Sequence, residues 1–223
     1  MTRAPFEDRR HAGRDLAQRL SRFAHRPDVT VLALPRGGVP VAAELASALD
    51  APLDVFIVRK LGVPGQPELA MGAIASGGTR VLNEDIVSSL EIHPETVDAV
   101  TADEAEELAR REHAYRDDRP PIDVRGRTVL LVDDGAATGA TMRVAAEALR
   151  QLHPARIVAV LPVASRDACE RVHRVCDAVV CAEMPEPFHA VAVWYDRFPQ
   201  VEDEEVMSAL ALAQAHPAGE GAA

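Results

Sequence analysis

The stretch VLLVDDGAATGAT, residues 129–141, restricts the fold of this chain more than any other part of its sequence. Four apolar residues, typical of a buried strand, run directly into Asp133 and Asp134, and a loop of glycine, alanine and threonine follows. Apolar runs of strand length elsewhere in the chain are separated by segments with a helical pattern. This alternation predicts an α/β fold in which helices cover both faces of a parallel sheet.

The other predicted elements follow the same alternation. Strands are predicted at 29–34, 53–58, 127–132, 155–163 and 177–181, and helices at 10–24, 39–50, 94–114, 139–151, 166–175 and 202–213. The segment 59–82 is rich in glycine and proline and predicts a long mobile loop with a hairpin. Within 94–114, Glu106–Arg110 and Glu107–Arg111 have the i,i+4 spacing of helical ion pairs.

Composition narrows the class of protein. The 35 acidic and 24 basic residues give a net charge of -11, which argues against duplex nucleic acid as a partner, because such binding needs a basic face. No apolar run approaches the ~20 residues of a membrane span, and the first residues lack the apolar core of a signal peptide. The three cysteines have no zinc-ligand spacing and suit reduced thiols. We expect a soluble cytoplasmic protein with no membrane partner.

The loop after the two aspartates has the composition of a phosphate-binding loop. Its residues are Ala137, Thr138, Gly139, Ala140 and Thr141. Small side chains let backbone N–H groups approach an anion, the following helix adds the positive end of its dipole, and the threonines add hydroxyl donors. Asp133 and Asp134 can accept hydrogen bonds from the vicinal hydroxyls of a sugar. Together these groups suit ribose 5-phosphate.

Several other motifs are excluded. A P-loop requires Gly-Lys where this chain has Ala140 and Thr141, and no G-x-G-x-x-G pattern is present. A serine hydrolase needs a G-x-S-x-G elbow, which Ser76 does not provide. An ordinary strand-to-helix turn capped by aspartate accounts for one acidic residue, but not for the whole arrangement.

Three stretches resemble the type I phosphoribosyltransferases. VLLVDDGAATGAT resembles the family signature, and LALPRGGVPVAAELASAL, at 32–49, resembles the pyrophosphate loop. In that loop Arg36 supplies charge or fixes the loop, while Gly37 and Gly38 permit unusual backbone angles that let their N–H groups face the diphosphate. MPEPFHAVAVWYDRF, at 184–198, resembles the hood of the 6-oxopurine enzymes, with Phe188 at the base-stacking position. A core position is the alternative for Phe188 and the favoured one for Trp194.

The resemblance implies a type I phosphoribosyltransferase-like fold with a small hood and a flexible loop. One domain would span 1–214, with a flexible-loop and helical insertion at 60–126, hood elements at 183–213 and a disordered tail at 215–223. It implies transfer of phosphoribose from 5-phosphoribosyl diphosphate (PRPP) to a small nitrogen acceptor, such as a nucleobase, with release of pyrophosphate. Mg²⁺ is the implied cofactor, held mainly through PRPP near Asp133 and Asp134, and nucleotide metabolism is the implied setting.

The resemblance also implies roles for individual residues. Asp133, Asp134, Arg36 and Lys60 would be catalytic, and PRPP would bind Arg36–Gly38, the two aspartates and 137–141. Lys60 would reach the leaving group when the mobile segment closes, a solvated surface lysine being the alternative.

Two departures bear on the acceptor. Ala137 stands where the 6-oxopurine enzymes have an aspartate, and LPVASRD lacks their base-reading lysine, so hypoxanthine and guanine are doubtful acceptors. The acceptor, the acid or base, the direction of flux and the oligomeric state stay open, a homodimer being one option. The alternative function is a non-catalytic PRPP- or nucleotide-sensing regulator on the same fold.

Overall fold

The computed structural model describes residues 5–117 and 119–215 and has the predicted α/β architecture. Its main sheet has five parallel strands in the order β2-β1-β6-β7-β8. The strands are β1 (Val29–Ala33), β2 (Leu53–Val55), β6 (Thr128–Val132), β7 (Arg156–Val163) and β8 (Ala178–Glu183). All carboxyl ends therefore lie at one edge, with β6 in the centre.

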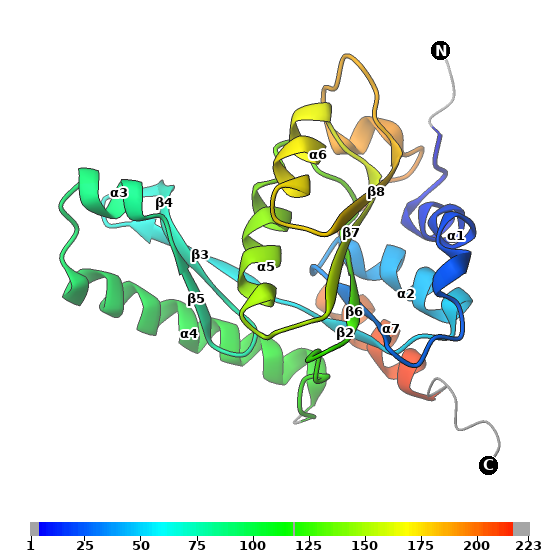
Figure 1. Ribbon diagram of the computed structural model, residues 1–223, viewed down its shortest axis with the longest axis horizontal. Coiled ribbons are helices and arrows are strands. Elements are labelled where there is room, and N and C mark those ends of the chain that lie inside the picture. The colour runs from blue at the N-terminus through cyan, green and yellow to red at the C-terminus, as the bar shows by residue number, and fades with distance from the viewer. Residues whose placement is uncertain (1–4, 118, 216–223) are drawn as a thin grey trace.

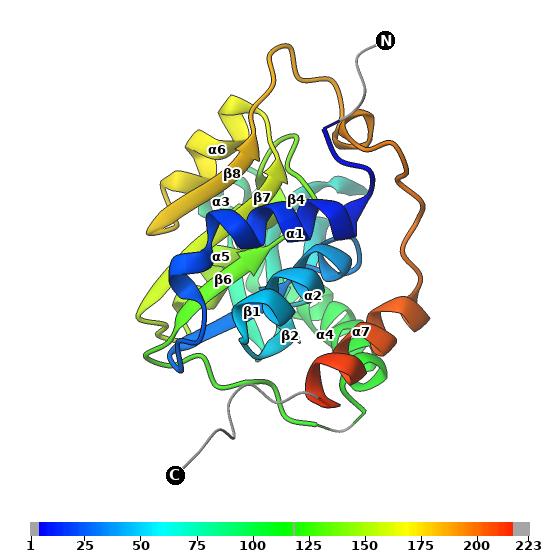
Figure 2. The ribbon, with the colours of Figure 1, turned by 90° about the vertical axis from the view of Figure 1, so that its right-hand side faces the viewer.

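Helices cover both faces of this sheet (Figure 2). One face carries α1 (Arg9–Arg19), α2 (Gly38–Leu49) and α7 (Asp203–Ala215), and the other carries α5 (Ala140–Arg150) and α6 (Arg166–His173). Short 3-10 turns lie at Ser21–Phe23 and Val191–Trp194, and the first of them buries Phe23 in the core. In β6, Leu130 and Val132 pack toward α1 and α2, while Val129 and Leu131 pack toward α5. This period of two explains why every residue of the strand is apolar apart from Thr128.

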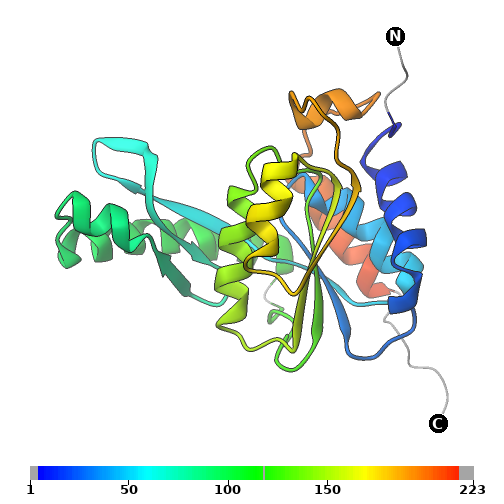
Figure 3. The ribbon, with the colours of Figure 1, turned by 45° about the horizontal axis from the view of Figure 1, so that its top comes forward.

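Residues 58–116 form an arm that extends away from the main sheet (Figures 1 and 3). It contains an antiparallel sheet of β3 (Val58–Val63), β4 (Gln66–Ala75) and β5 (Thr79–Leu82), followed by α3 (Glu84–Ser89) and α4 (Pro94–Arg116). The long loop expected here is wrong, because Leu61, Met71 and Ile74 are buried and hold the strands together. The hairpin is confirmed, with its turn at Gly65, where φ is +79°.

Most predicted elements appear within a few residues of their expected ends. The helix expected at 10–24 ends earlier, at Arg19, and a 3-10 turn follows it. The expected strand 53–58 is divided between β2 and β3. The Glu107–Arg111 pair is confirmed, but Arg110 pairs with Glu107 rather than with Glu106. The expected tail begins too early, since Ala215 still belongs to α7, and 216–223 lie outside the described residues. No helix in the described part of the chain is long and apolar enough to cross a membrane.

Candidate active site

Asp133 and Asp134, the acidic pair, lie at the carboxyl end of β6, where the sequence places them. An Asp133 Oδ1 atom accepts a 2.9 Å hydrogen bond from the backbone N–H of Asp134. Both residues are half-buried. The pair is therefore held at the sheet edge, where ligands of parallel α/β folds bind.

The Arg36–Gly38 loop, which follows β1, packs directly against the acidic pair. A Cβ atom on Gly37 would overlap the carboxylate of Asp134, and one on Gly38 would lie 2.6 Å from the carbonyl oxygen of Val132. The two family-like motifs, far apart in sequence, thus meet in space.

The expectation that Gly37 and Gly38 adopt unusual backbone angles is wrong. Gly37 has φ -58° and ψ -35°, and Gly38 begins α2, so neither needs a left-handed conformation. They are required by close approach. The Gly38 N–H donates to the Leu34 carbonyl at 3.1 Å, so it does not face the site as expected. The peptide bond between Pro35 and Arg36 is cis.

The loop 137–141 leads into the N-terminus of α5. Gly139, at φ +73°, is the N-cap, and the Thr138 hydroxyl accepts a weak 3.4 Å bond from the Ala140 N–H. Ser165 Oγ donates to the Ala137 carbonyl at 2.7 Å, which holds the loop against α6. Among the described residues, the amides of Ala137, Thr138 and Gly139 have no hydrogen-bond acceptor. These free donors at a helix N-terminus are suited to an anion.

Arg9 is a site residue that sequence reasoning missed. Its Nε donates to Asp134 Oδ2 at 2.7 Å, its Nη1 donates to the Pro199 carbonyl at 2.7 Å, and its guanidinium lies 3.6 Å from the Phe198 ring centroid. The side chains of Arg9 and Asp134 are only 10% and 16% exposed. The sequence contains one signal of this contact. A positive charge at the first position of a helix is unfavourable beside the positive end of the helix dipole, so such an arginine needs a partner elsewhere in the fold.

The segment 184–200, here called the hood segment, closes one side of the site. Tyr195 donates its hydroxyl to the Asp134 carbonyl at 2.6 Å and packs against Phe198, with ring centroids 4.8 Å apart. Phe188 and Trp194 are half-buried against the same aromatic cluster. The core reading of Trp194 agrees with this packing, although its buried Nε1 has no hydrogen-bond partner among the described residues.

Comparison with known proteins identifies the family to which the chain belongs. A family model described as the phosphoribosyl transferase domain matches residues 7–196, which is most of the chain. The chain belongs to the phosphoribosyl transferase domain family.

The names of two relatives agree with this membership, and one solved structure is similar in sequence and fold. Two Mycobacterium tuberculosis proteins, from different strains and each named "Putative phosphoribosyl transferase", are 46% identical over 205 residues, or 92% of this chain. This phosphoribosyl transferase domain spans about half of their length, 46%. The crystal structure of TT1426 from Thermus thermophilus is 42% identical, with a TM-score of 0.82, covering 92% of this chain and 97% of that one.

Burial raises the pKa of both carboxyl groups in the acidic pair. Burial, and then the neighbouring Asp134, raise the pKa of Asp133 well above its ordinary value. Burial also raises the pKa of Asp134, although its hydrogen bond from Arg9 acts in the opposite direction. Burial likewise raises the pKa of the Tyr195 hydroxyl. A cation bound beside the pair would lower both pKa values and favour the ionised carboxylates.

Replacing Asp133 with asparagine is expected to stabilise the phosphoribosyl transferase domain at neutral pH by about 1–2 kcal/mol. The unfolded chain ionises this carboxyl near pH ~4, whereas the folded chain keeps it protonated to higher pH. The stabilising contribution of Asp133 is thus present below pH ~4 and is lost as the pH rises toward the raised pKa. Asparagine avoids this loss, and its side-chain oxygen can still accept from the Asp134 N–H.

Urea denaturation at acidic and neutral pH measures this effect. The free energies of unfolding of the variant and the wild type should converge near pH ~4 and separate as the pH rises. A variant less stable than the wild type at pH ~8 would mean that the ionised Asp133 is stabilised in the folded protein, contrary to the burial argument.

The remaining predicted residues lie at the border of the site or on the arm. Arg36 Nη1 lies 3.7 Å from Asp203 and 3.9 Å from Glu202, at the start of α7. This contact suits the expected role of fixing the loop. Lys60 lies on β3, and its amine is 3.4 Å from Glu68 on the same hairpin. The phosphoribosyl transferase structure therefore brings the acidic pair, the glycines and 137–141 together, and leaves Lys60 on the arm.

Proposed function

We propose that this domain binds PRPP and transfers its phosphoribosyl group to a small nitrogen acceptor, such as a nucleobase, with release of pyrophosphate. The observation that carries the proposal is the contact of Gly37 with Asp134, which joins the Arg36–Gly38 loop to the acidic pair beside 137–141. These three groups match the three parts of PRPP: diphosphate, ribose hydroxyls and 5-phosphate. Family membership supports a transferase of this kind.

Each part of the site has a task in the transfer. The free amides of 137–139 and the Thr138 and Thr141 hydroxyls bind the 5-phosphate, while Asp133 and Asp134 accept hydrogen bonds from the ribose hydroxyls. As pyrophosphate leaves, positive charge develops at the anomeric carbon, and negative potential from the acidic pair stabilises it. Arg36 supplies positive charge to the diphosphate, and its contacts with Glu202 and Asp203 at the start of α7 hold its side chain.

The acidic pair also fits Mg²⁺. This ion is commonly held by one or two carboxylates together with substrate phosphates, rather than by a protein cage. The described residues contain no cluster of three or more metal-ligating side chains, so Asp133 and Asp134 would share the ion with PRPP. Mg²⁺ bound there would supply charge neutralisation to the diphosphate.

The acceptor can be identified by direct assay. The protein is incubated with PRPP, Mg²⁺ and a panel of nucleobases and other nitrogen compounds, and pyrophosphate release is followed for each. Ala137 lies at the exposed start of the loop, in place of an acidic group, so acceptors other than hypoxanthine and guanine are expected to react. Release that never exceeds hydrolysis of PRPP alone, with any acceptor, would favour the PRPP-sensing alternative.

Replacing Thr138 and Thr141 with valine is expected to weaken binding of PRPP and of ribose 5-phosphate. Both side chains are exposed at the start of α5, so the change removes two donors and keeps the shape. Each lost hydrogen bond to a charged phosphate should cost ~1.5–3 kcal/mol. Calorimetry with both ligands measures the loss, and Thr96→Val with Thr101→Val on α4 is the matched control. Equal affinities in the two double variants would show that the 137–141 loop does not bind the phosphate.

Binding of PRPP is expected to slow amide exchange in the arm. Lys60 lies on a hairpin joined to the core through β2 and Ile57, and its proposed role at the leaving group requires this hairpin to move toward the acidic pair. Hydrogen exchange of residues 60–80 with and without Mg²⁺-PRPP is the measurement. Unchanged exchange across this segment would leave Lys60 as a surface lysine of the arm.

A further inference from the structure

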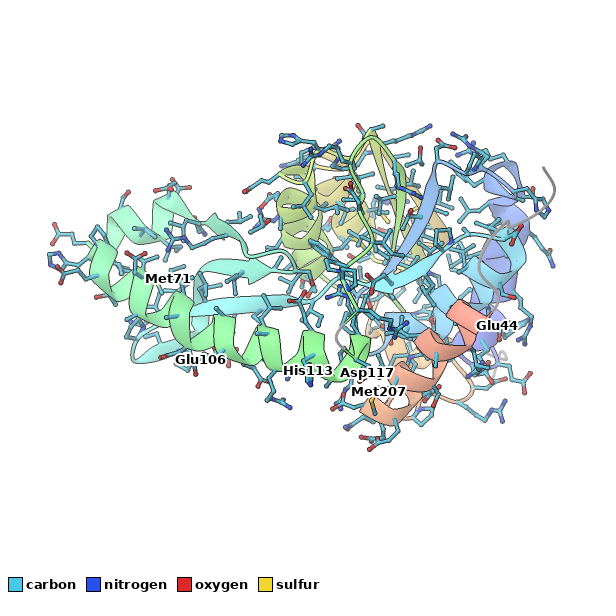
Figure 4. All side chains as sticks on the ribbon, turned by 90° about the horizontal axis from the view of Figure 1, so that it is seen from below. Glu44, Met71, Glu106, His113, Asp117 and Met207 are labelled. Atoms are coloured by element: carbon cyan, nitrogen blue, oxygen red, sulfur yellow. The ribbon has the colours of Figure 1, made fainter. Side chains whose placement is uncertain are left out.

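A large cavity lies at the opposite end of the main sheet from the acidic pair. Its volume is about 790 Å³, and its wall includes Pro27, just before β1, Leu53, at the start of β2, and Arg127, just before β6. In Figure 1 this end of the sheet is at the bottom, whereas the hood segment, in orange, is at the top. Figure 4 looks onto this lower end, where the end of α4, at Asp117, lies beside α7, at Met207.

The cavity wall carries four arginines in a chain whose net charge is -11. Two of them are neutralised locally, since Arg26 lies 2.6 Å from Asp28 and Arg116 lies 2.9 Å from Asp54. The other two, Arg119 and Arg127, have no carboxylate partner within the described ranges 5–117 and 119–215. Arg116 also contacts Glu112, at 2.8 Å, and Asp50 contacts His25, so the carboxylates at this wall have partners other than Arg119 and Arg127.

Backbone contacts hold these two arginines and leave donors available. Arg119 donates its Nε to the Arg116 carbonyl at 2.7 Å, which leaves both of its terminal nitrogens. Arg127 uses one terminal nitrogen for weak contacts with the Pro27 carbonyl and Thr30 Oγ1, at 3.4 and 3.3 Å. Two guanidinium groups with free planar donors are suited to a phosphate, which accepts several charge-assisted hydrogen bonds.

The rest of the wall is largely apolar, apart from His25 and Asp50. Pro27, Pro52, Leu53, Pro120 and Ile122 line it. Proline rings lose little entropy when they contact a ligand, and a flat apolar surface suits a ring system rather than a bare ion. We propose that this cavity binds an organic phosphate with a ring body, such as a nucleoside monophosphate, at a site separate from the acidic pair. Its phosphate lies on Arg119 and Arg127.

Adenosine 5′-monophosphate is a suitable probe, followed through the side-chain Nε–Hε NMR signals of arginine. Single Arg119→Gln and Arg127→Gln variants assign the two signals. Titration is expected to shift both signals saturably, and to shift them less with adenosine or inorganic phosphate alone. The double variant Arg119→Gln/Arg127→Gln should weaken binding at this site about tenfold for each arginine.

The matched control is Arg125→Gln/Arg174→Gln, which removes two exposed arginines that do not line the cavity. It should bind the probe as the wild type does. The proposal is overturned if the probe shifts only signals at the acidic pair, such as that of Arg9, or shifts all exposed arginines alike. It is equally overturned if the two double variants bind the probe with the same affinity. None of these results depends on whether the protein is a transferase.

Discussion

Replacement of both Asp133 and Asp134 by asparagine is expected to lower turnover by about 10²–10³. The variant keeps the size of the two side chains and most of their hydrogen bonding, but loses two negative charges beside the anomeric carbon. That charge matters most when the carbon becomes cationic, so turnover should fall more than PRPP affinity. The fold should survive, because an asparagine oxygen at position 134 can still accept the hydrogen bond from Arg9 Nε, and one at position 133 can still accept from the Asp134 backbone N–H.

A second adjacent acidic pair supplies the control for this prediction. Glu84 and Asp85 lie exposed in the first turn of α3, on the arm. Glu84→Gln/Asp85→Asn removes the same charge and should leave turnover close to that of the wild type. Steady-state kinetics with the acceptor found in the panel, together with calorimetry for PRPP, separates the two effects. Normal turnover in the Asp133/Asp134 variant would make these carboxylates structural, and the proposed mechanism would be wrong.

Replacement of Arg9 by methionine is expected to lower the free energy of unfolding by about 3 kcal/mol at neutral pH. Methionine retains an unbranched apolar side chain for contact with Phe198, but it leaves the Asp134 carboxylate without its ion pair in a mostly buried position. The loss should shrink in acid, where Asp134 becomes protonated in the folded variant. Urea denaturation measures both effects.

The next residue, Arg10, is the matched control for Arg9. Its side chain is 51% exposed and lies 3.4 Å from Glu44, so Arg10→Met should change stability by less than about 0.5 kcal/mol. In the double variant Arg9→Met/Asp134→Asn no unpaired carboxylate remains, and part of the lost stability should return. Equal stability of the Arg9 and Arg10 variants would show that the buried ion pair contributes nothing to folding.

Local patterns were enough to predict the main sheet and its helices. The structure agrees with the expected ranges 127–132 and 139–151 to within one residue at each end, since the elements are Thr128–Val132 and Ala140–Arg150. This agreement is possible because apolar runs and helical periodicity are properties of neighbouring residues. The loop between them could also be predicted, since its small residues and position after a strand carry the signal.

Features that depend on distant contacts could not be predicted in this way. The arm sheet was expected as a long mobile loop with a hairpin, because its glycines and prolines hide a strand pattern that packing against α3, α4 and α5 stabilises. Gly37 was correctly singled out, but for its backbone angles, since no local pattern shows that Asp134 will lie against it. Arg9 belongs to the site through Asp134 and Pro199, residues more than a hundred positions away.

The bonds from Arg9 to Asp134 and to Pro199 also determine where the chain can be cut. The family match ends at residue 196, before Phe198 and Pro199 and before the Glu202 and Asp203 carboxylates that face Arg36. A fragment trimmed to that boundary would keep the signature at 129–141 and the pyrophosphate-like loop at 32–49, yet it would lose contacts of both arginines that border the acidic pair. Expression boundaries, fusion partners and affinity tags therefore need to leave the stretch from Asp8 through α7 intact, even though its last part lies beyond the family match.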